Sequence, residues 1–309
     1  MERLARVILQ GRLPAALIAA SLFLLSLFVP LLGGLLMMVA AVPAAVVAWH
    51  VGARAVTEVG ALAALVIGLA TLQPLVPLSW LVTFWIPVAA GTLILRRGPY
   101  FGWLALGSTV LVLVGIGVWM LLVGPDAEAV VRDWTTQQLH SWVQGSNLPQ
   151  GEVDSAMREL EGRVVPTVAL VLPGLLASAI LTLWWINVLA GLRLAAAAGP
   201  MPDLGGALRA FRVPDATLWL AIGLGVLAWL GAGGASGYWA ANGLVVLSLP
   251  FLAQGLAVVH SARMVFNIAT GWMVVFYILL GLFPQLGLAV VLLGLADVWA
   301  DFRSRLTSE

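Results

Sequence analysis

Long runs of apolar residues, separated by short polar breaks, dominate the chain from end to end. Runs of roughly 17–25 apolar residues are long enough to cross the hydrocarbon core of a bilayer as single helices. Cutting the chain at charges, prolines and glycine clusters gives ten such segments. We expect membrane helices at about 13–29, 31–49, 59–75, 79–95, 101–123, 164–190, 216–231, 238–259, 265–283 and 285–300.

Two of the breaks, and the N-terminus, leave alternatives open. Only Gln73–Pro77 separates the third segment from the fourth, and only Pro284-Gln285 separates the ninth from the tenth, so either pair could include a re-entrant or tilted helix. A basic start followed by an apolar run is also typical of a signal peptide. The run ends at Pro30 without a small-residue cleavage site and apolar sequence resumes at once, so we interpret it as the first membrane helix.

Residues 124–163 form the one long polar stretch and divide the apolar sequence into two blocks. They carry seven of the fourteen acidic residues and three of the fifteen arginines. An apolar stripe at intervals of four, three and four predicts a helix that runs into the sixth segment, and the polar sequence upstream suggests a surface helix. We expect a solvated cap over the bundle or, alternatively, a lid over an outward-facing cavity. The stripe consists of Val153, Met157, Leu160 and Val164.

The arginines orient the segments. If the N-terminus is cytoplasmic, twelve of the fifteen arginines fall in cytoplasmic connections, and 124–163 is external. Tryptophans near the predicted helix ends agree with this arrangement, because indole prefers the headgroup region. We therefore predict an all-α polytopic membrane bundle with both termini inside. It comprises a five-span half (1–123), an external, amphipathic and acidic helical segment (124–163), and a second five-span half with a short cytoplasmic tail (164–309).

Composition supports the membrane assignment and excludes several functions. The chain is 62% hydrophobic and 9% charged with a mean hydropathy of +1.05, whereas soluble domains carry roughly 25% charged residues. The net charge of +1 gives no field for nucleic acid. The absence of cysteine excludes disulfides, thiolate catalysis and cysteine-bound metal. No catalytic, cofactor or metal motif stands out, so we expect no enzyme, and an intramembrane enzyme ranks third among the hypotheses.

A few polar residues lie within the apolar segments, where ionisable groups are costly and tend to be functional. Asp297, Asp301 and Arg305 share one face of a helix, which predicts an Asp301–Arg305 pair. Gln254 lies about two turns from the inner end of its segment and needs a partner for its amide. Each of these residues could form a helix–helix contact or line a cavity. The candidate ligand-binding residues are Gln254, Asn267, Asp297 and His260.

Three stretches carry a family resemblance: the tail Leu293–Leu306, Pro250-x-x-x-Gln254-Gly-Leu-Ala upstream of it, and Phe211–Asp215. They resemble the YybS-like bacterial membrane proteins, catalogued as domain of unknown function 2232, a family without an established activity. That family is loosely similar to the substrate-binding components of energy-coupling-factor vitamin transporters. Those components have six spans, and an Ala-x-x-x-Ala patch on their first helix meets the energising module. The matching pairs here are Ala15/Ala19 and Ala16/Ala20.

The sequence favours an inner-membrane protein that binds or transports a small molecule. The alternative is a non-transport scaffold or assembly partner that contacts other membrane or cytoplasmic subunits. Transport predicts that Gln254, Asn267 and Asp297 face one hydrated cavity, whereas a scaffold predicts that they are paired within a packed bundle. Candidate partner-contact residues are Ala15, Ala19, Arg212, Asp301 and Arg303.

Overall fold

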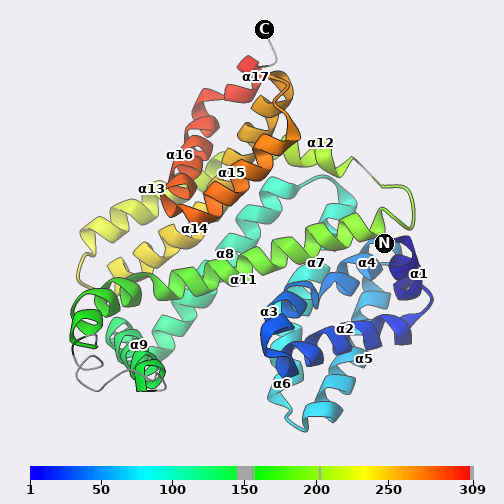
Figure 1. The fold of residues 1–309 in the computed structure, drawn as a ribbon, viewed down its shortest axis with the longest axis horizontal. Coiled ribbons are helices and arrows are strands. Elements are labelled where there is room, and N and C mark those ends of the chain that lie inside the picture. The colour runs from blue at the N-terminus through cyan, green and yellow to red at the C-terminus, as the bar shows by residue number, and fades with distance from the viewer. Residues whose placement is uncertain (145–154, 156, 202, 307–309) are drawn as a thin grey trace. The chain divides into compact units, whose positions relative to one another are not determined.

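The computed structural model describes residues 1–144, 155, 157–201 and 203–306, and within these ranges the chain is helical and forms no strand (Figure 1). It divides into two compact units. Unit 1 consists of Met1–Leu104 and Ile180–Phe211, and unit 2 of Ala105–Ala179 and Arg212–Glu309. Two of the three boundaries fall inside long helices, so α8 (Phe101–Val123) and α11 (Val165–Ala195) contribute to both units, and the third follows Phe211. The predicted division at 124–163 concerns the course of the chain across the membrane and stays a prediction.

The remaining helices are shared between the units as follows. Unit 1 contains α1 (Glu2–Leu9), α2 (Arg12–Phe28), α3 (Pro30–Val39), α4 (Val42–His50), α5 (Ala53–Thr71), α6 (Leu75–Trp80), the π-helical turn η1 (Leu81–Trp85), α7 (Ile86–Arg97) and α12 (Leu204–Arg209). Unit 2 contains α9 (Ala127–Gln144), the π-helical turn η2 (Leu160–Val164), α13 (Asp215–Leu230), α14 (Ala235–Val265), α15 (Thr270–Leu282), α16 (Pro284–Ala300) and α17 (Phe302–Leu306).

All ten predicted segments are helical, but ten full-length spans are not confirmed. Among the described residues, six helices are long and apolar enough to cross a membrane, or up to eight if each of two bent pairs is one span. Helix length explains part of the difference. At 1.5 Å per residue, the 16 residues of α13 reach only about 24 Å, short of the roughly 30 Å hydrocarbon core.

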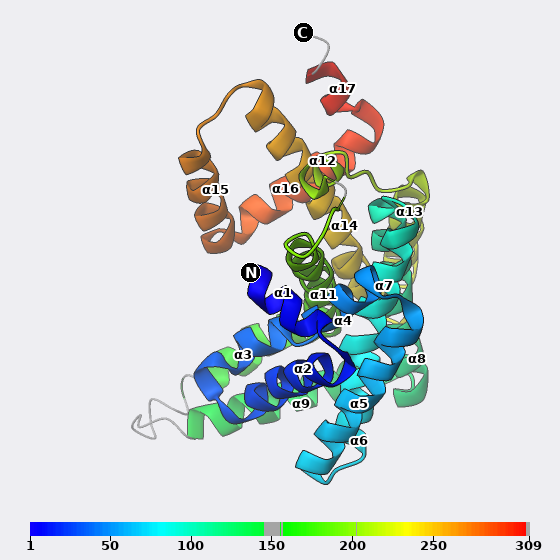
Figure 2. The ribbon, with the colours of Figure 1, turned by 90° about the vertical axis from the view of Figure 1, so that its right-hand side faces the viewer.

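The two bent pairs lie near the two ends of the chain. Helix α1 meets α2 at 118°, and α15 meets α16 at 110° (Figure 2). The second bend falls at Phe283 and Pro284, since proline lacks the N–H that a continuous helix needs. Of the two pairs with open alternatives, the third and fourth segments are separate candidate spans (Ala53–Thr71 and Leu75–Arg97), whereas the ninth and tenth form this bent pair.

The acidic segment folds largely as its pattern predicts. Residues Met157–Ala195 form one candidate span of 39 residues, which confirms that the helix continues into the sixth segment. Of the apolar stripe, Met157 is buried, Leu160 is half-buried and Val164 is 43% exposed, while Val153 lies outside the described residues. Upstream, α9 is a helix whose His140 Nε2 lies 2.7 Å from Glu161 Oε1 of η2. Whether the segment is a cap or a lid stays a prediction.

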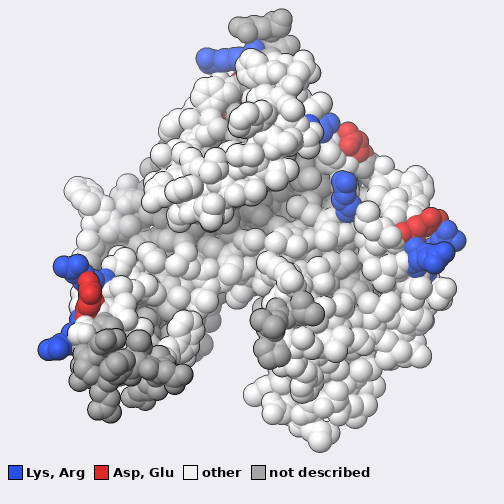
Figure 3. Space-filling model, viewed as in Figure 1, with Lys and Arg blue, Asp and Glu red and all other residues white. Residues whose placement is uncertain are grey.

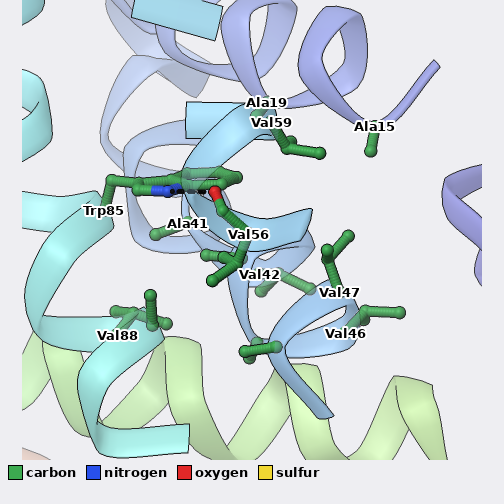
Figure 4. Close-up of a cluster of buried hydrophobic side chains, with 14 of the residues drawn as sticks. Ala15, Ala19, Ala41, Val42, Val46, Val47, Val56, Val59, Trp85 and Val88 are labelled. Carbon is green, nitrogen blue, oxygen red and sulfur yellow. Dashed lines mark hydrogen bonds between the residues drawn. The ribbon is translucent and has the colours of Figure 1, made fainter. Parts of the chain in front are cut away.

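Unit 1 is built around small side chains. Alanines on α2 and α4, together with valines on α4 and α5, form a buried core that Figure 4 shows around Trp85. The indole N–H of Trp85 donates to Val56 O at 3.1 Å. Gly60 makes room for this ring, because a Cβ there would lie 2.3 Å from Trp85 Nε1. Close approach through alanine and glycine is the usual basis of helix packing in lipid.

A break between α3 and α4 is stabilised by a side chain from α11. The backbone N–H of Ala41 donates to Asn187 Oδ1 at 3.0 Å, and Asn187 Nδ2 donates to Met38 O at 2.8 Å. Asn187 also donates to Leu183 O of its own helix. In lipid no water can satisfy backbone groups that a helix break exposes, so one amide side chain replaces it here.

Unit 2 uses the same device at a proline inside α11. Pro173 cannot donate to Ala169 O, the carbonyl four residues earlier. Tyr238 Oη donates to that carbonyl at 2.8 Å. Next to it, Gly174 N–H donates to Asn242 Oδ1 at 2.7 Å, and Asn242 Nδ2 donates to Leu170 O at 3.0 Å. Helix α14 thus satisfies the backbone that the proline disrupts.

Helices α14 and α16 of unit 2 approach each other through glycine. A Cβ on Gly255 would lie 2.0 Å from Val290 O, and a Cβ on Gly294 would lie 1.9 Å from Phe251 O. Each glycine therefore touches the backbone of the opposite helix. This close packing brings Gln254, beside Gly255, next to the last turn of α16.

Candidate functional site

The buried polar group of unit 2 centres on Asp297, in the last turn of α16. Only 1% of Asp297 is exposed, and 7% of Arg303 on α17. Arg303 Nη2 donates to Asp297 Oδ2 at 2.8 Å, and the backbone N–H of Phe302 donates to Asp297 Oδ1 at 3.0 Å. Both carboxylate oxygens are therefore bonded, which offsets the large cost of removing a charge from water.

Gln254 of α14 extends this group toward the start of α13. Its Nε2 donates to Asp297 Oδ2 at 2.9 Å, and its Oε1 accepts the backbone N–H of Val213 at 2.9 Å. Val213 precedes Pro214, and a residue before proline is held extended, so its N–H is not used in a helix. Gln254 thus bridges a backbone donor and a carboxylate, both out of contact with solvent.

A second ion pair closes the group at its exposed side. Arg212 donates from Nη2 to Asp301 Oδ1. Asp301 has a φ of 43°, in the left-handed region, and its backbone ends α16. The hydrogen bond from Arg212 lowers the pKa of the Asp301 carboxyl below its usual 3.8. We call Arg212, Gln254, Asp297, Asp301 and Arg303 the Asp297 cluster.

The Asp297 cluster leaves little capacity for a ligand on its two innermost members. Gln254, 2% exposed, directs its amide oxygen to Val213 and its amide nitrogen to Asp297. Such a fully paired network fixes the positions of helices rather than binding a solute. Within the described part of the chain, no group of three or more His, Asp or Glu side chains could hold a metal ion.

The structure gives the other two ligand-binding candidates different positions. Asn267 is exposed and has a φ of 49° just after α14, and Ile268 N–H returns to Arg263 O at 3.0 Å. That pattern is a left-handed helix C-terminus, a position that asparagine tolerates. His260 Nε2 lies 2.7 Å from Tyr277 Oη of α15. Of the three residues that the two hypotheses placed together, Gln254 and Asp297 are hydrogen-bonded to each other, whereas Asn267 has a local role in ending its helix.

The candidate partner-contact residues are mostly engaged within the chain. Ala15 and Ala19 are fully buried in unit 1, so contact through them would require α2 to leave its neighbours. Arg303 is buried against Asp297, while Arg212 and Asp301 pair with each other and stay partly exposed. Partner contact through these residues stays a prediction, and only the Arg212–Asp301 side of the Asp297 cluster is accessible.

Sequence spacing did not predict the two ion pairs of the Asp297 cluster. The expected Asp301–Arg305 pair assumes a continuous helix, and the left-handed Asp301 separates α16 from α17. Asp301 pairs with Arg212, 89 positions away, and Asp297 pairs with Arg303. The break had no clear signal in the sequence.

The stretches that carry the family resemblance contribute every member of the Asp297 cluster. They are Phe211–Asp215, Pro250–Gln254 and Leu293–Leu306. A family model described as "Predicted membrane protein (DUF2232)" matches residues 17–298. No curated protein and no solved structure matches the chain. The chain therefore belongs to this family of predicted membrane proteins.

Proposed function

We propose that this membrane protein is a scaffold or assembly component that presents a fixed polar surface to another subunit. The observation that carries the proposal is the pairing of Gln254 with Asp297 inside a packed helix interface. A carrier needs polar groups that exchange their partners for a solute. These two side chains are instead bonded to each other, to the backbone and to Arg303.

The Asp297 cluster supports this role because it joins two connections of unit 2. Val213 and Arg212, which lead into α13, are bonded to Gln254 and Asp301, and α17 is bonded through Phe302 and Arg303. Helix α17 exposes Ser304 and Arg305 beside these contacts. Pre-organised surfaces bind partners with less loss of conformational entropy.

The proposal includes location. Following the arginine distribution, the protein lies in the bacterial inner membrane with both termini and α17 on the cytoplasmic side and 124–163 outside. The partner is then a cytoplasmic or membrane protein that approaches α17. The proposal assigns no catalysis to the chain. It also does not use the energy-coupling-factor likeness, because Ala15 and Ala19 are buried within unit 1.

Purification in native lipid, followed by mass spectrometry of co-purifying proteins and small molecules, tests the proposal. We expect a stoichiometric protein partner to co-purify with the wild-type chain. The variant Arg305→Glu on α17 should lose this partner, whereas the control variant Arg132→Glu on α9, with the same charge reversal, should keep it. A small molecule retained at one per chain, without a protein partner, would overturn the proposal.

A second candidate, a transporter-like protein that binds a small molecule, rests on the bend between α15 and α16. Interrupted membrane helices surround the substrate site in many secondary transporters, and this pair is bent by 110° at a proline. The same purification separates the two functions, because a carrier should retain or exchange a solute independently of any partner.

A further inference from the structure

Helix α1 has a composition suited to a membrane surface. It turns away from α2 at 118°, and Ala5 and Ile8 hold it against unit 1, since neither is more than 2% exposed. Leu4 and Val7 lie beside this buried face and are 49% and 38% exposed. Arg3 follows Val7 around the helix, so an exposed apolar edge borders a basic one. That arrangement is typical of helices that lie in the headgroup region.

Other arginines gather at the same end of unit 1. Arg12 at the start of α2 and Arg54 near the start of α5 both pair with Glu58. Arg96, in the last turn of α7, donates from Nη1 to Ala48 O of α4 at 3.4 Å. Because α4 ends at His50 and α5 begins at Ala53, these contacts lie together.

The end of α11 joins this group through His50, whose Nε2 lies 3.0 Å from Ala195 O. Arg193 belongs to the last turn of that helix. These elements carry seven arginines and two glutamates, Glu2 and Glu58, which gives a formal excess of five positive charges. Figure 3 shows that much of the visible surface carries no charge and that a group of charged side chains lies over α1. The basic end of unit 1 consists of Arg3, Arg6, Arg12, Arg54, Arg96, Arg97 and Arg193.

We propose that the basic end of unit 1 binds the headgroups of anionic phospholipids, with Leu4 and Val7 inserted at the interface. Charge complementarity selects this ligand, because the side chains of Arg12 and Arg54 are 59% and 89% exposed and their guanidinium groups can pair with phosphate. The apolar helices that start at this end place the arginines at the membrane boundary. Nucleic acid is a poor match, since the whole chain has a net charge of only +1.

Native mass spectrometry of the full chain with equal amounts of phosphatidylglycerol and phosphatidylcholine tests the proposal. We compare Arg3→Gln/Arg6→Gln/Arg54→Gln with the matched triple variant Arg132→Gln/Arg158→Gln/Arg163→Gln, which removes the same charge from unit 2. Each arginine near an anionic surface raises the affinity for that surface roughly fivefold. The contribution is smaller for an arginine that is already paired with a glutamate. We expect the first variant to lose at least about tenfold in preference for phosphatidylglycerol, and the matched variant to keep it.

Two outcomes would overturn the proposal. One is an unchanged preference in the first variant, and the other is an equal loss in both variants, which would indicate net charge rather than a surface. If the triple variant does not fold, Arg54→Gln alone serves, because its side chain is 89% exposed and Glu58 keeps Arg12. The preference of that variant for phosphatidylglycerol should fall by up to roughly fivefold. The preference of the wild-type protein should fall as the salt concentration is raised.

Discussion

Units 1 and 2 each contain an interrupted helix inside an apolar bundle. They differ in how much charge they bury. Asn187 satisfies the backbone between α3 and α4, and Asn242 satisfies α11 next to Pro173. Unit 2 adds the buried Asp297–Arg303 pair, whereas the core of unit 1 is alanine and valine around Trp85. A polar residue at membrane depth is therefore first a sign of disrupted backbone and only then of a ligand.

The largest expected effect is on the buried charge pair, Asp297 and Arg303, which among the described residues belongs to unit 2. Arg303→Leu leaves Asp297 without its cation and should destabilise the protein by about 3–5 kcal/mol. Unfolding in detergent, followed by tryptophan fluorescence, measures the loss. Adding Asp297→Asn to the same chain should recover part of the stability, because the uncompensated charge is gone. A double variant no more stable than Arg303→Leu would contradict the role assigned to the pair.

Substitution of the two asparagines tests whether both units depend on an amide side chain to satisfy the backbone of a broken helix. Asn187→Leu and Asn242→Leu each leave a backbone N–H and carbonyls without partners, and each should cost about 1–3 kcal/mol in unfolding free energy. We expect similar losses in the same assay. Asn267→Gly is the control, since glycine suits the left-handed position and should cost almost nothing. Very unequal losses would show that the units do not depend on their asparagines alike.

Glycine contacts distinguish the units by what each glycine touches. Gly294→Ala places a methyl group 1.9 Å from a backbone oxygen of α14 and should cost about 1–3 kcal/mol. Gly60→Ala in unit 1 meets the indole of Trp85, which is side chain rather than backbone, so its cost should be smaller. Gly115→Ala, with nothing within 4 Å, should not lower thermal stability, because alanine suits a helix interior better than glycine. A larger loss at Gly60 than at Gly294 would reverse this ranking.

The smallest effect concerns the exposed Arg212–Asp301 pair of unit 2. The pair lowers the pKa of Asp301 below 3.8, so its stabilisation is present above pH 3.8 and is lost as the pH falls through the lowered pKa. Arg212→Gln should return the pKa toward 3.8, which an NMR titration of the aspartate carboxyl carbons can follow. No change in that titration would show that Arg212 does not act on Asp301.

The helices were predictable because apolar runs and their breaks are local properties of the sequence. The number of membrane spans was not predictable in the same way, because α13 is too short to cross the hydrocarbon core and α15 bends away from α16 at Pro284. The Gln254–Asp297 bond joins residues 43 positions apart, so only their shared need for partners could be inferred. Asn267 fell inside the predicted ninth segment, whereas in the structure it follows α14 at a left-handed helix C-terminus, a position that asparagine tolerates.

Helix α11 determines when unit 1 can finish folding during synthesis of the chain. Unit 1 needs Asn187 to complete the junction of α3 and α4, yet Asn187 is synthesised only after α8, α9 and the first half of α11 have emerged. Domains usually mature from the N-terminus as the ribosome delivers them. This N-terminal unit can complete its α3–α4 junction only after a later segment of the chain has been synthesised.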